Sequence, residues 1–375
     1  MYQKFRGIRI MAYSDIKDPS AHFQATTYTG NGGNGHVITH TGNSDLQADM
    51  VWVKTRSASG PPVVYDTNRR PSGTPFSGSL YMLPLGNNYA TGAENTGAYG
   101  PTAIGSNSVT MNQYDFINKN SETFVSWNWK ANGGTTVSNT DGDITSTVQV
   151  NQDAGFSIIT YTGSGTTDDT IGHGLGVEPD IAIFKRRSGG TGNWDVQHND
   201  GAPGPITVAF RNTLNLTEGT ATNVLSSFSS STLGLSTGGD AQKNVSGSNY
   251  VCYAFKGKQG YSKFGTYYGN GSTDGKFVYL GFKPALIIFK VLSDPNHGWS
   301  MIDNTRSPFN LMDDNLFANN DAAETTDQNK VDFLSNGFKC RGSTYPANAG
   351  GTNTFSYFAW AENPFVAGGV PTTAR

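Results

Sequence analysis

The stretch Phe156-Ser-Ile-Ile-Thr-Tyr161-Thr-Gly163-Ser-Gly165 occurs three times in this chain in slightly altered form. The other two copies are Phe23-Gln-Ala-Thr-Thr-Tyr28-Thr-Gly30-Asn-Gly32 and Phe264-Gly-Thr-Tyr267-Tyr-Gly269-Asn-Gly271. Self-similarity of this kind indicates a repeated structural unit. The sequence therefore predicts three copies of one module.

Each copy continues with the same order of segments. The apolar runs Met50-Val-Trp-Val-Lys54, Ile181-Ala-Ile-Phe-Lys185 and Leu286-Ile-Ile-Phe-Lys290 are followed, after a polar loop, by the strand-like segments Val63-Val-Tyr-Asp66, Trp194-Asp-Val-Gln197 and Trp299-Ser-Met-Ile-Asp303. Copies one and three go on as Asp66-Thr-Asn-Arg69 and Asp303-Asn-Thr-Arg306. Copy two has His198-Asn-Asp200 at this place and lacks the arginine.

Each copy closes with an aromatic segment that carries aromatic residues at its first, fourth and sixth places. The three segments are Phe124-Val-Ser-Trp-Asn-Trp129, Tyr250-Val-Cys-Tyr-Ala-Phe255 and Phe355-Ser-Tyr-Phe-Ala-Trp360. Alternate residues of a strand share a face, so places four and six lie on one face and place one lies on the other. We expect a strand buried on both faces, near the middle of its module.

The expected fold is all-β, with three tandem antiparallel β-sandwich modules of a jelly-roll-like kind. Their expected ranges are 23–132, 155–257 and 258–366. Residues 1–22 are expected to form an N-terminal arm for attachment, residues 133–154 an extended linker, and residues 367–375 a C-terminal tail. The best candidate for a short helix lies near residues 315–325.

Composition excludes several classes of protein. Charged residues make up 15 % of the chain, the net charge is −3, and no basic stripe is visible, which disfavours nucleic-acid binding. No apolar run is long enough to span a bilayer, and the start of the chain lacks the features of a signal peptide. Cys252 and Cys340 fall at non-equivalent places, so we expect reduced, buried and unreactive thiols and assembly in a cytoplasm.

Groups that carry catalysis or bind cofactors are sparse. The six histidines form no metal motif, and Gly30-Asn-Gly-Gly-Asn-Gly35 lacks the lysine and helix start of a phosphate-binding loop. Asp141 and Asp143 lack the full spacing of a calcium loop. Asp66 and Asp303 can be interpreted as a catalytic carboxylate pair or as strand-end aspartates that pair with Arg69 and Arg306. We favour the structural role and expect no enzyme activity, no cofactor and no metal.

The middle of each copy aligns only loosely, and loops of this kind carry most recognition. Four tyrosines there are candidates for contact with a receptor or glycan, namely Tyr81, Tyr89, Tyr99 and Tyr345, because tyrosine is common at binding hot spots. Trp194 and Trp299 begin apolar segments at equivalent places. We expect these two tryptophans in the core.

Several long segments resemble a repeat domain that is common in bacteriophages, notably marine ones, and in prophages. The segments are Asp153-Ala-Gly-Phe-Ser-Ile-Ile-Thr-Tyr-Thr-Gly163, Ile171-Gly-His-Gly-Leu-Gly-Val-Glu-Pro179, Gly260-Tyr-Ser-Lys-Phe-Gly-Thr-Tyr-Tyr-Gly-Asn-Gly271, Phe333-Leu-Ser-Asn-Gly-Phe-Lys339 and Ala359-Trp-Ala-Glu-Asn-Pro-Phe365. The resemblance covers the chain from Phe23 onward. It implies a virion structural or tail-fibre-like protein and no catalytic residues.

The resemblance and the residues together predict a non-enzymatic virion protein, assembled in the host cytoplasm. It would form a tail or capsid surface appendage that aids adsorption to the host. Its expected partners are other virion proteins, further copies of itself in a homo-oligomer, and host-surface glycan, with no nucleic acid and no membrane insertion. The alternatives are a carbohydrate-binding module that recognises cell-surface glycans and a glycan-degrading enzyme.

Overall fold

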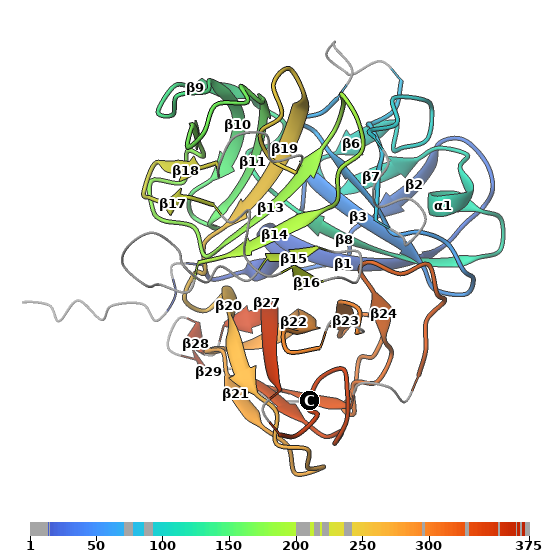
Figure 1. Ribbon diagram of the computed structural model, residues 1–375. Coiled ribbons are helices and arrows are strands. Elements are labelled where there is room, and N and C mark those ends of the chain that lie inside the picture. The colour runs from blue at the N-terminus through green and yellow to red at the C-terminus, as the bar shows by residue number, and fades with distance from the viewer. Residues whose placement is uncertain are drawn as a thin grey trace, which may run out of the picture.

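The computed structural model shows a nearly all-β chain built of three modules (Figure 1). It describes residues 14, 16–70, 78–85, 93–199, 211–213, 218–219, 225–235, 242–294, 297–326, 330–351, 353–364, 366–367 and 370–371. Each module pairs one large antiparallel sheet with one small antiparallel sheet. The all-β expectation is confirmed.

Module one contains a five-stranded and a three-stranded sheet. The large sheet has the order β1 (Phe23–Thr29), β8 (Thr123–Trp129), β3 (Met50–Thr55), β4 (Val63–Asp66) and β5 (Leu83–Pro84). The small sheet has the order β2 (His36–Thr39), β7 (Ser108–Met111) and β6 (Ala103–Gly105). A 3₁₀ helix, η1 (Pro19–Ala21), precedes β1, and one turn of α-helix, α1 (Asp115–Asn118), precedes β8.

Module two has the widest sheet of the described chain. Its order is β16 (Glu218–Gly219), β15 (Arg211–Thr213), β14 (Asp195–His198), β13 (Ile181–Arg186), β19 (Asn249–Phe255), β11 (Phe156–Thr162), β10 (Ser146–Asn151) and β9 (Val137–Asn139). The small sheet has the order β12 (Thr170–Gly172), β18 (Thr232–Gly234) and β17 (Ser227–Phe228).

Module three repeats the arrangement of module one. The large sheet has the order β20 (Ser262–Tyr268), β27 (Thr354–Pro364), β22 (Phe282–Val291), β23 (Ser300–Asp303) and β24 (Leu316–Phe317). The small sheet has the order β21 (Phe277–Tyr279), β26 (Gly337–Cys340) and β25 (Val331–Leu334), and β28 (Val366–Ala367) pairs with β29 (Val370–Pro371).

The large sheets are buried on both faces. One face of each packs against the small sheet of its own module, and this gives three separate sandwich cores. The opposite faces of all three large sheets meet in a fourth cluster, which we call the central core. In β8, Phe124 lies in the sandwich core whereas Trp127 and Trp129 lie in the central core. This confirms the expected burial of the closing aromatic strand on both faces.

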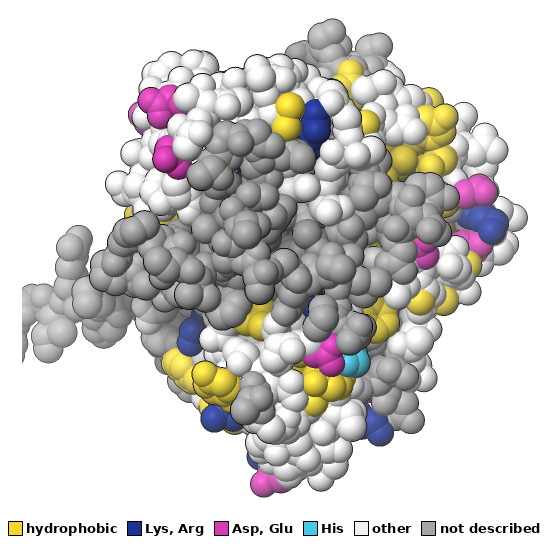
Figure 2. Space-filling view, in the orientation of Figure 1, with side chains coloured by type: hydrophobic (Ala, Val, Ile, Leu, Met, Phe, Trp, Pro, Cys, Tyr) yellow, Lys and Arg dark blue, Asp and Glu magenta, His cyan; other side chains and the backbone are white. Residues whose placement is uncertain are grey.

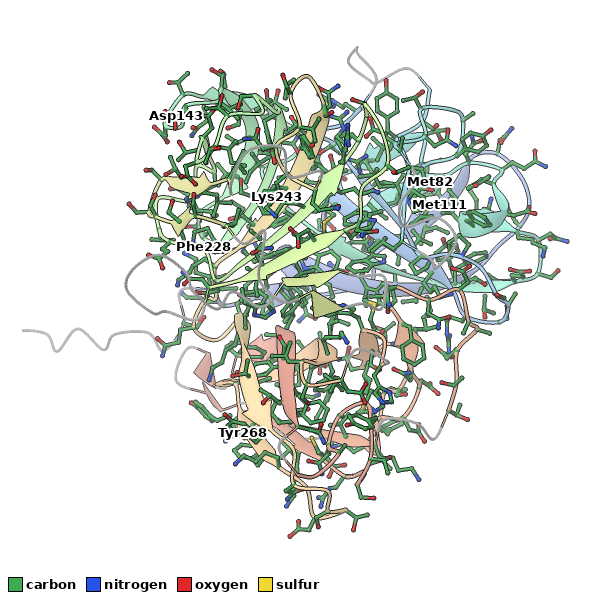
Figure 3. The ribbon with its side chains drawn as sticks, viewed as in Figure 1. Met82, Met111, Asp143, Phe228, Lys243 and Tyr268 are labelled. Atoms are coloured by element: carbon green, nitrogen blue, oxygen red, sulfur yellow. The ribbon has the colours of Figure 1, made fainter. Side chains whose placement is uncertain are left out.

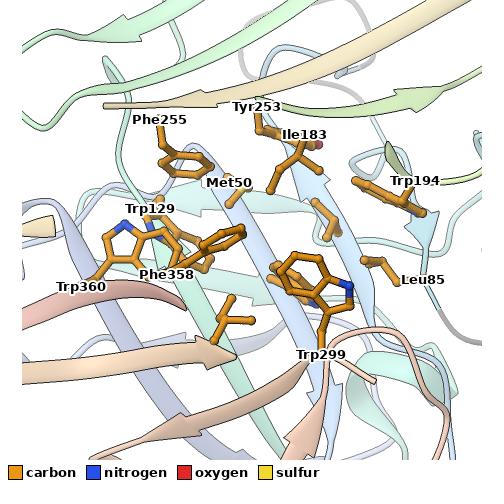
Figure 4. A pocket seen from close by; sticks show the side chains of 13 residues that line it. Met50, Leu85, Trp129, Ile183, Trp194, Tyr253, Phe255, Trp299, Phe358 and Trp360 are labelled. Carbon is orange, nitrogen blue, oxygen red and sulfur yellow. The ribbon is translucent and has the colours of Figure 1, made fainter. Parts of the chain in front are cut away.

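Equivalent aromatic residues of the three modules touch in the central core (Figure 4). The sixth-place residues Trp129, Phe255 and Trp360 lie with ring centroids 5.3 Å apart for Trp129–Trp360 and 5.6 Å apart for Phe255–Trp360. They line an apolar cavity of about 30 Å³, together with the expected core residues Trp194 and Trp299, each 1 % exposed. The modules therefore pack around a common centre, with no solvent layer between their large sheets.

The repeated tyrosine–glycine stretch is explained by its turn. The hydroxyls of Tyr28, Tyr161 and Tyr267 each donate to a backbone carbonyl just before an asparagine, at Ile117, Lys243 and Ala347. In module one the asparagine, Asn118, is fully buried; its Oδ1 accepts from the amide of Asn31, and its Nδ2 donates to the Gly33 carbonyl. Asn244 and Asn348 hold the other two turns in the same way.

Both glycines of this stretch are required by the backbone. A Cβ at Gly30 would lie 2.2 Å from the Lys119 carbonyl oxygen, so no side chain fits there. Gly32 has a φ of 66°, in the left-handed region that favours glycine. The stretch is a folding element that ties the start of each module to its closing strand.

Three expectations about local structure are corrected. Residues 133–154 are not a free linker, because β9 and β10 within them join the large sheet of module two. In module three the ladder places Ser262 opposite Trp360, as Phe23 lies opposite Trp129, so Phe264 corresponds to Ala25 and not to Phe23. Residues 315–325 contain the short strand β24 and turns in place of a helix.

Candidate functional site

The junction between modules one and two is sealed by a buried ion-pair network. Asp66 accepts from Arg69 Nε at 2.6 Å and from the Tyr253 hydroxyl of module two at 2.5 Å. Arg69 also pairs with Glu94 at 2.6 Å, and Glu94 pairs with Arg187 of module two at 2.8 Å. The side chains of Asp66 and Arg69 are fully buried, so the network serves packing between modules.

The junction between modules three and one repeats this network residue for residue. Asp303 accepts from Arg306 Nε at 2.6 Å and from the Trp127 indole of module one at 3.0 Å. Arg306 pairs with Glu324 at 2.8 Å, and Glu324 pairs with Arg56 of module one at 2.7 Å. The backbone confirms the equivalence, because the amides of Glu94 and Glu324 donate to the carbonyls of Arg187 and Arg56.

The junction between modules two and three has no such network among the described residues. His198 takes the place of Asp66 and Asp303, since it lies opposite Ile181 as they lie opposite Met50 and Leu286. Its Nε2 lies 3.1 Å from the Ser356 hydroxyl, and its ring packs on Phe358 at 5.1 Å. Burial lowers the pKa of His198 to about 3, so the ring is neutral at pH 7.

The partner residues follow the same pattern. Leu292 of module three occupies the place of Arg56 and Arg187. The backbone amide of each of these residues donates to the carbonyl of the first residue of a closing strand. These acceptors are Thr123, Asn249 and Thr354. Among the described residues, each junction is therefore charged on both sides or neutral on both sides, which avoids leaving an unpaired charge buried.

The two glutamates keep their charge although they are largely buried. Burial acts to raise the pKa of Glu94, but the charge of Arg69 and the hydrogen bond from Arg187 lower it below its usual value. The pKa of Glu324 is lowered in the same way by Arg56 and Arg306, against the effect of burial. Both carboxylates therefore bind arginine at neutral pH.

Three buried lysines form a second set of equivalent groups. Lys54, Lys185 and Lys290 are fully buried, and each ammonium group donates to a carbonyl of the loop that follows its strand, at Gly60, Gly192 and His297. Burial lowers the pKa of Lys54 to about 8 and that of Lys185 to about 7. Such perturbed groups can mark active sites, but the threefold repetition with the same carbonyl contact indicates a structural role.

The candidate tyrosines occupy unlike surroundings. Tyr81 is half-buried, and Tyr89 lies outside the described residues. Tyr99 is 38 % exposed and packs on Tyr114 with ring centroids 4.8 Å apart. Tyr345 stacks on His297 at 3.9 Å, and its hydroxyl donates to Asn353 at 2.9 Å. Of the three described tyrosines, only Tyr99 offers much ring surface to a ligand.

Three exposed aromatic residues that the sequence did not single out lie on two strands of module three. Tyr268 at the end of β20 is 67 % exposed, and Phe277 and Tyr279 on β21 are 41 % and 47 % exposed. Figure 2 shows hydrophobic side chains with basic ones beside them over this part of module three, and Figure 3 marks Tyr268. We call these three exposed residues the aromatic face; Tyr268 belongs to the large sheet, and Phe277 and Tyr279 belong to the small sheet. Alternation of Phe277 and Tyr279 around buried Val278 is the sequence signal that indicates it.

Charged groups lie beside Phe277 and Tyr279 of the aromatic face. The Lys263 ammonium group lies 5.5 Å from the centroid of the Tyr279 ring and donates to the Tyr279 carbonyl at 2.7 Å. Lys339 lies opposite Phe277 in the ladder and pairs with Asp274 at 2.6 Å. Aromatic planes beside hydrogen-bonding groups suit a ligand that has both apolar and hydroxyl surfaces.

The aromatic face is specific to module three. Thr29 and Thr162 occupy the place of Tyr268, because each follows the repeated tyrosine at the end of its strand. The corresponding small-sheet strands carry Val37 and Thr39 in module one and Thr170 and Gly172 in module two. The other two modules fold with smaller side chains at the places of Tyr268, Phe277 and Tyr279. The aromatic side chains therefore indicate a role other than folding.

The described residues contain no cluster of three or more His, Cys, Asp or Glu side chains arranged to hold a metal ion. Cys252 and Cys340 are free and buried, and burial raises the pKa of Cys340 to about 12. Within the described part of the chain, no helix has the length and apolar character needed to cross a bilayer.

Comparison with known proteins gives a family that spans all three modules. The model of a domain of unknown function, DUF7483, matches residues 18–364. The chain belongs to the DUF7483 family. No curated protein and no solved structure matches it. The match covers nearly the same part of the chain as the resemblance to the phage repeat domain.

Proposed function

We propose that this DUF7483 chain is a non-enzymatic structural protein of a bacteriophage virion, a surface appendage of the tail or capsid that helps the particle adsorb to its host. One observation carries the proposal. The framework residues repeat in all three modules and pack them into one unit, whereas the exposed aromatic face belongs to module three alone. A rigid repeated support with one distinct exposed face suits display toward another surface.

The buried positions of the acidic candidates support a role without catalysis. Asp66 and Asp303 are both 0 % exposed, and each is hydrogen-bonded to an arginine of its own module and an aromatic residue of the next. A substrate cannot reach these carboxylates without separating two modules.

Electron microscopy of purified virions labelled with antibody to this chain tests the proposal. The expected result is labelling at one defined position, on the tail or on the capsid surface. Particles that carry no label and no copy of the chain by mass spectrometry would overturn the virion assignment.

A second candidate function, a free carbohydrate-binding module, is favoured by the aromatic face itself. The apolar face of a sugar ring packs on an aromatic plane, and Lys263 and Lys339 lie close enough to bind its hydroxyls. A glycan array probed with the full chain, Tyr268→Ala, Phe277→Ala and the control Tyr99→Ala tests it. Loss of binding in the first two variants alone would support glycan recognition, and no binding by the full chain would contradict it.

A further inference from the structure

The outer edge of the large sheet in module two is covered by a strand. β10 pairs with β11 over five residues, from Thr147 opposite Thr160 to Asn151 opposite Phe156. The start of the same segment reaches the small sheet, because Ile144 bridges to Ile171 and the Ser146 hydroxyl donates to the Gly172 carbonyl at 2.7 Å. β10 therefore closes the side of the sandwich between β11 and β12.

The same side of module one is an open groove. Among the described residues, no strand pairs with the outer edge of β1, the counterpart of β11. A groove of about 380 Å³ lies between β1 and β2, lined by residues 26–29 and 36–39. It adjoins a second hollow of about 160 Å³ beside Phe23, Gln24 and Ala25, and both are lined by Thr41 and Thr305. The five residues 23–27 that line these hollows correspond to the five that β10 covers in module two.

A cross-module contact confirms that the two sides are equivalent. The Asn68 amide of module one donates to the carbonyl of Ile158 in β11 at 2.9 Å and to that of Thr147 in β10 at 3.0 Å. Thr305 follows Asp303 by two residues, as Asn68 follows Asp66, and its hydroxyl lies 3.4 Å from the Ala25 carbonyl. Ala25 corresponds to Ile158, since they lie opposite Trp127 and Tyr253.

Module three protects this side by other means. Lys263 on β20 bridges to the Tyr279 carbonyl on β21 at 2.7 Å and so spans the two sheets. A lysine at a sheet edge discourages pairing with another strand. Of the three corresponding sides, one is covered by a strand, one is bridged by a lysine, and the side at β1 offers backbone groups along a hydroxyl-rich groove.

We propose that the groove beside β1 binds an extended strand from a second copy of this chain, formed by its residues 8–13. An exposed sheet edge binds such a strand through main-chain hydrogen bonds, while alternate side chains fill the sandwich. The segment Ile8-Arg-Ile-Met-Ala-Tyr13 places Ile8, Ile10 and Ala12 at alternate positions, as β10 and the residues before it place Ile144, Val148 and Val150. Six residues are long enough to cover the five of β1.

The path of the following residues favours a second copy over the same copy. The Ser14 hydroxyl donates to the Gln259 carbonyl of module three at 2.8 Å, and Ile16 enters the central core. The chain then makes η1 before it reaches Phe23. β10, in contrast, enters β11 directly through the turn at residues 152–155. Residues 8–13 thus adjoin an anchored segment beside module three, and a neighbouring copy can supply the strand without a return path.

Sedimentation velocity of the full chain over a range of concentrations tests the proposal. The expected result is reversible self-association that is weakened on the order of 100-fold in Ile8→Asp/Ile10→Asp, because two buried isoleucines are lost. Thr39→Trp, which fills the groove from β2, has the same effect, whereas the control Thr136→Trp at an exposed position of module two has none. A synthetic peptide of residues 5–14 dissociates the assembly and slows hydrogen exchange of the β1 amides.

Three results would overturn the proposal. The first is a full chain that is monomeric at every concentration, and the second is a Thr39→Trp variant that associates as strongly as the unchanged chain. The third is a peptide that binds no better than one in which Ile8 and Ile10 are aspartate. None of these measurements depends on the source of the chain or on glycan binding, so their failure is distinct from failure of the proposed function.

Discussion

The junctions on either side of module one differ in kind from the junction between modules two and three. The first two hold a strand-end aspartate, two arginines and a glutamate, joined across the interface to Tyr253 or Trp127. The third holds His198 against Ser356 and Phe358. Equivalent places at the junctions are therefore occupied by charged residues in two cases and by neutral residues in the third. Where His198 replaces the aspartate, Leu292 replaces the arginine on the opposite side.

The comparison shows that burial requires each charged residue of a repeated interface to keep its partner. A buried charge without its partner is costly, so losing Arg69 or Asp66 alone would destabilise the junction strongly. In the described part of the junction between modules two and three, His198 is held by a hydrogen bond with Ser356 and by packing on Phe358. We infer that the residues on the two sides of a junction change together. Two junctions carry the aspartate–arginine–glutamate network, and the third carries His198 and Leu292 at the equivalent places.

Removing an aspartate from a charged junction should have the largest effect. Asp66→Ala and Asp303→Ala each leave a buried arginine without its fully buried partner, and we expect each to lower the free energy of unfolding by about 3–5 kcal/mol. Urea unfolding measures the loss. The exposed Asp45 provides the control, since Asp45→Ala should change stability by less than about 0.5 kcal/mol.

The double variant Asp66→Leu/Arg69→Met separates ion pairing from packing. Because it removes both buried charges, it should cost less than Asp66→Ala alone. A loss in the double variant equal to the sum of the losses in the two single variants would show that the charges do not act as a pair.

Acid should weaken the neutral junction before the charged ones. Unfolded histidine binds a proton near pH 6.5, whereas His198 in the fold does so only near pH 3, so the unfolded state holds more protons between these values. Stability therefore falls as the pH drops through this window, by about 2 kcal/mol for His198 between pH 7 and pH 5. His198→Gln should reduce the difference in unfolding free energy between these two pH values.

The charged junctions respond at lower pH. The folded pKa values of Glu94 and Glu324 lie below the usual value, so their contribution is present above about pH 4.5 and is lost as the pH falls through the lowered values. A loss of stability between pH 7 and pH 5 that is unchanged in His198→Gln would contradict the assignment of the first window to His198.

The outer glutamates should have the smallest effect. Glu94→Gln and Glu324→Gln keep the shape of the side chain and leave the aspartate–arginine pair in place, so each should cost about 1 kcal/mol. Thermal unfolding at pH 7 measures the change. Losses as large as those of the aspartate variants would contradict this order and mean that the glutamates stabilise the junctions as much as the aspartates do.

The sequence predicted the framework because the framework repeats. The closing aromatic segments, the lysine-ended runs and the motifs from Asp66 to Arg69 and from Asp303 to Arg306 stand at matching places, and each marks a strand or its end. The junction partners Glu94 and Glu324 lie in the loosely aligned middles, where spacing gives no register. Their alignment follows only from backbone contacts between modules.

Tertiary contacts also decide features that local pattern leaves open. The sequence predicts an extended linker over residues 133–154 because their alternation indicates a strand but not the strand that lies beside it. The sequence aligns Phe264 with Phe23 because both are phenylalanines at the start of the repeated stretch. In the ladder, however, Ser262 occupies the place of Phe23. The sequence predicts ligand contacts for tyrosines in loops, whereas the aromatic face lies on strands, where alternation alone does not show which side chains are exposed.

Native-state hydrogen exchange of Asp303→Ala tests whether the three modules form one unit through a shared core and matched junctions. If they do, protection of the closing strands β8, β19 and β27 falls together, although the substitution touches only modules three and one. Reduced protection confined to β8 and β27, with β19 unchanged, would contradict it.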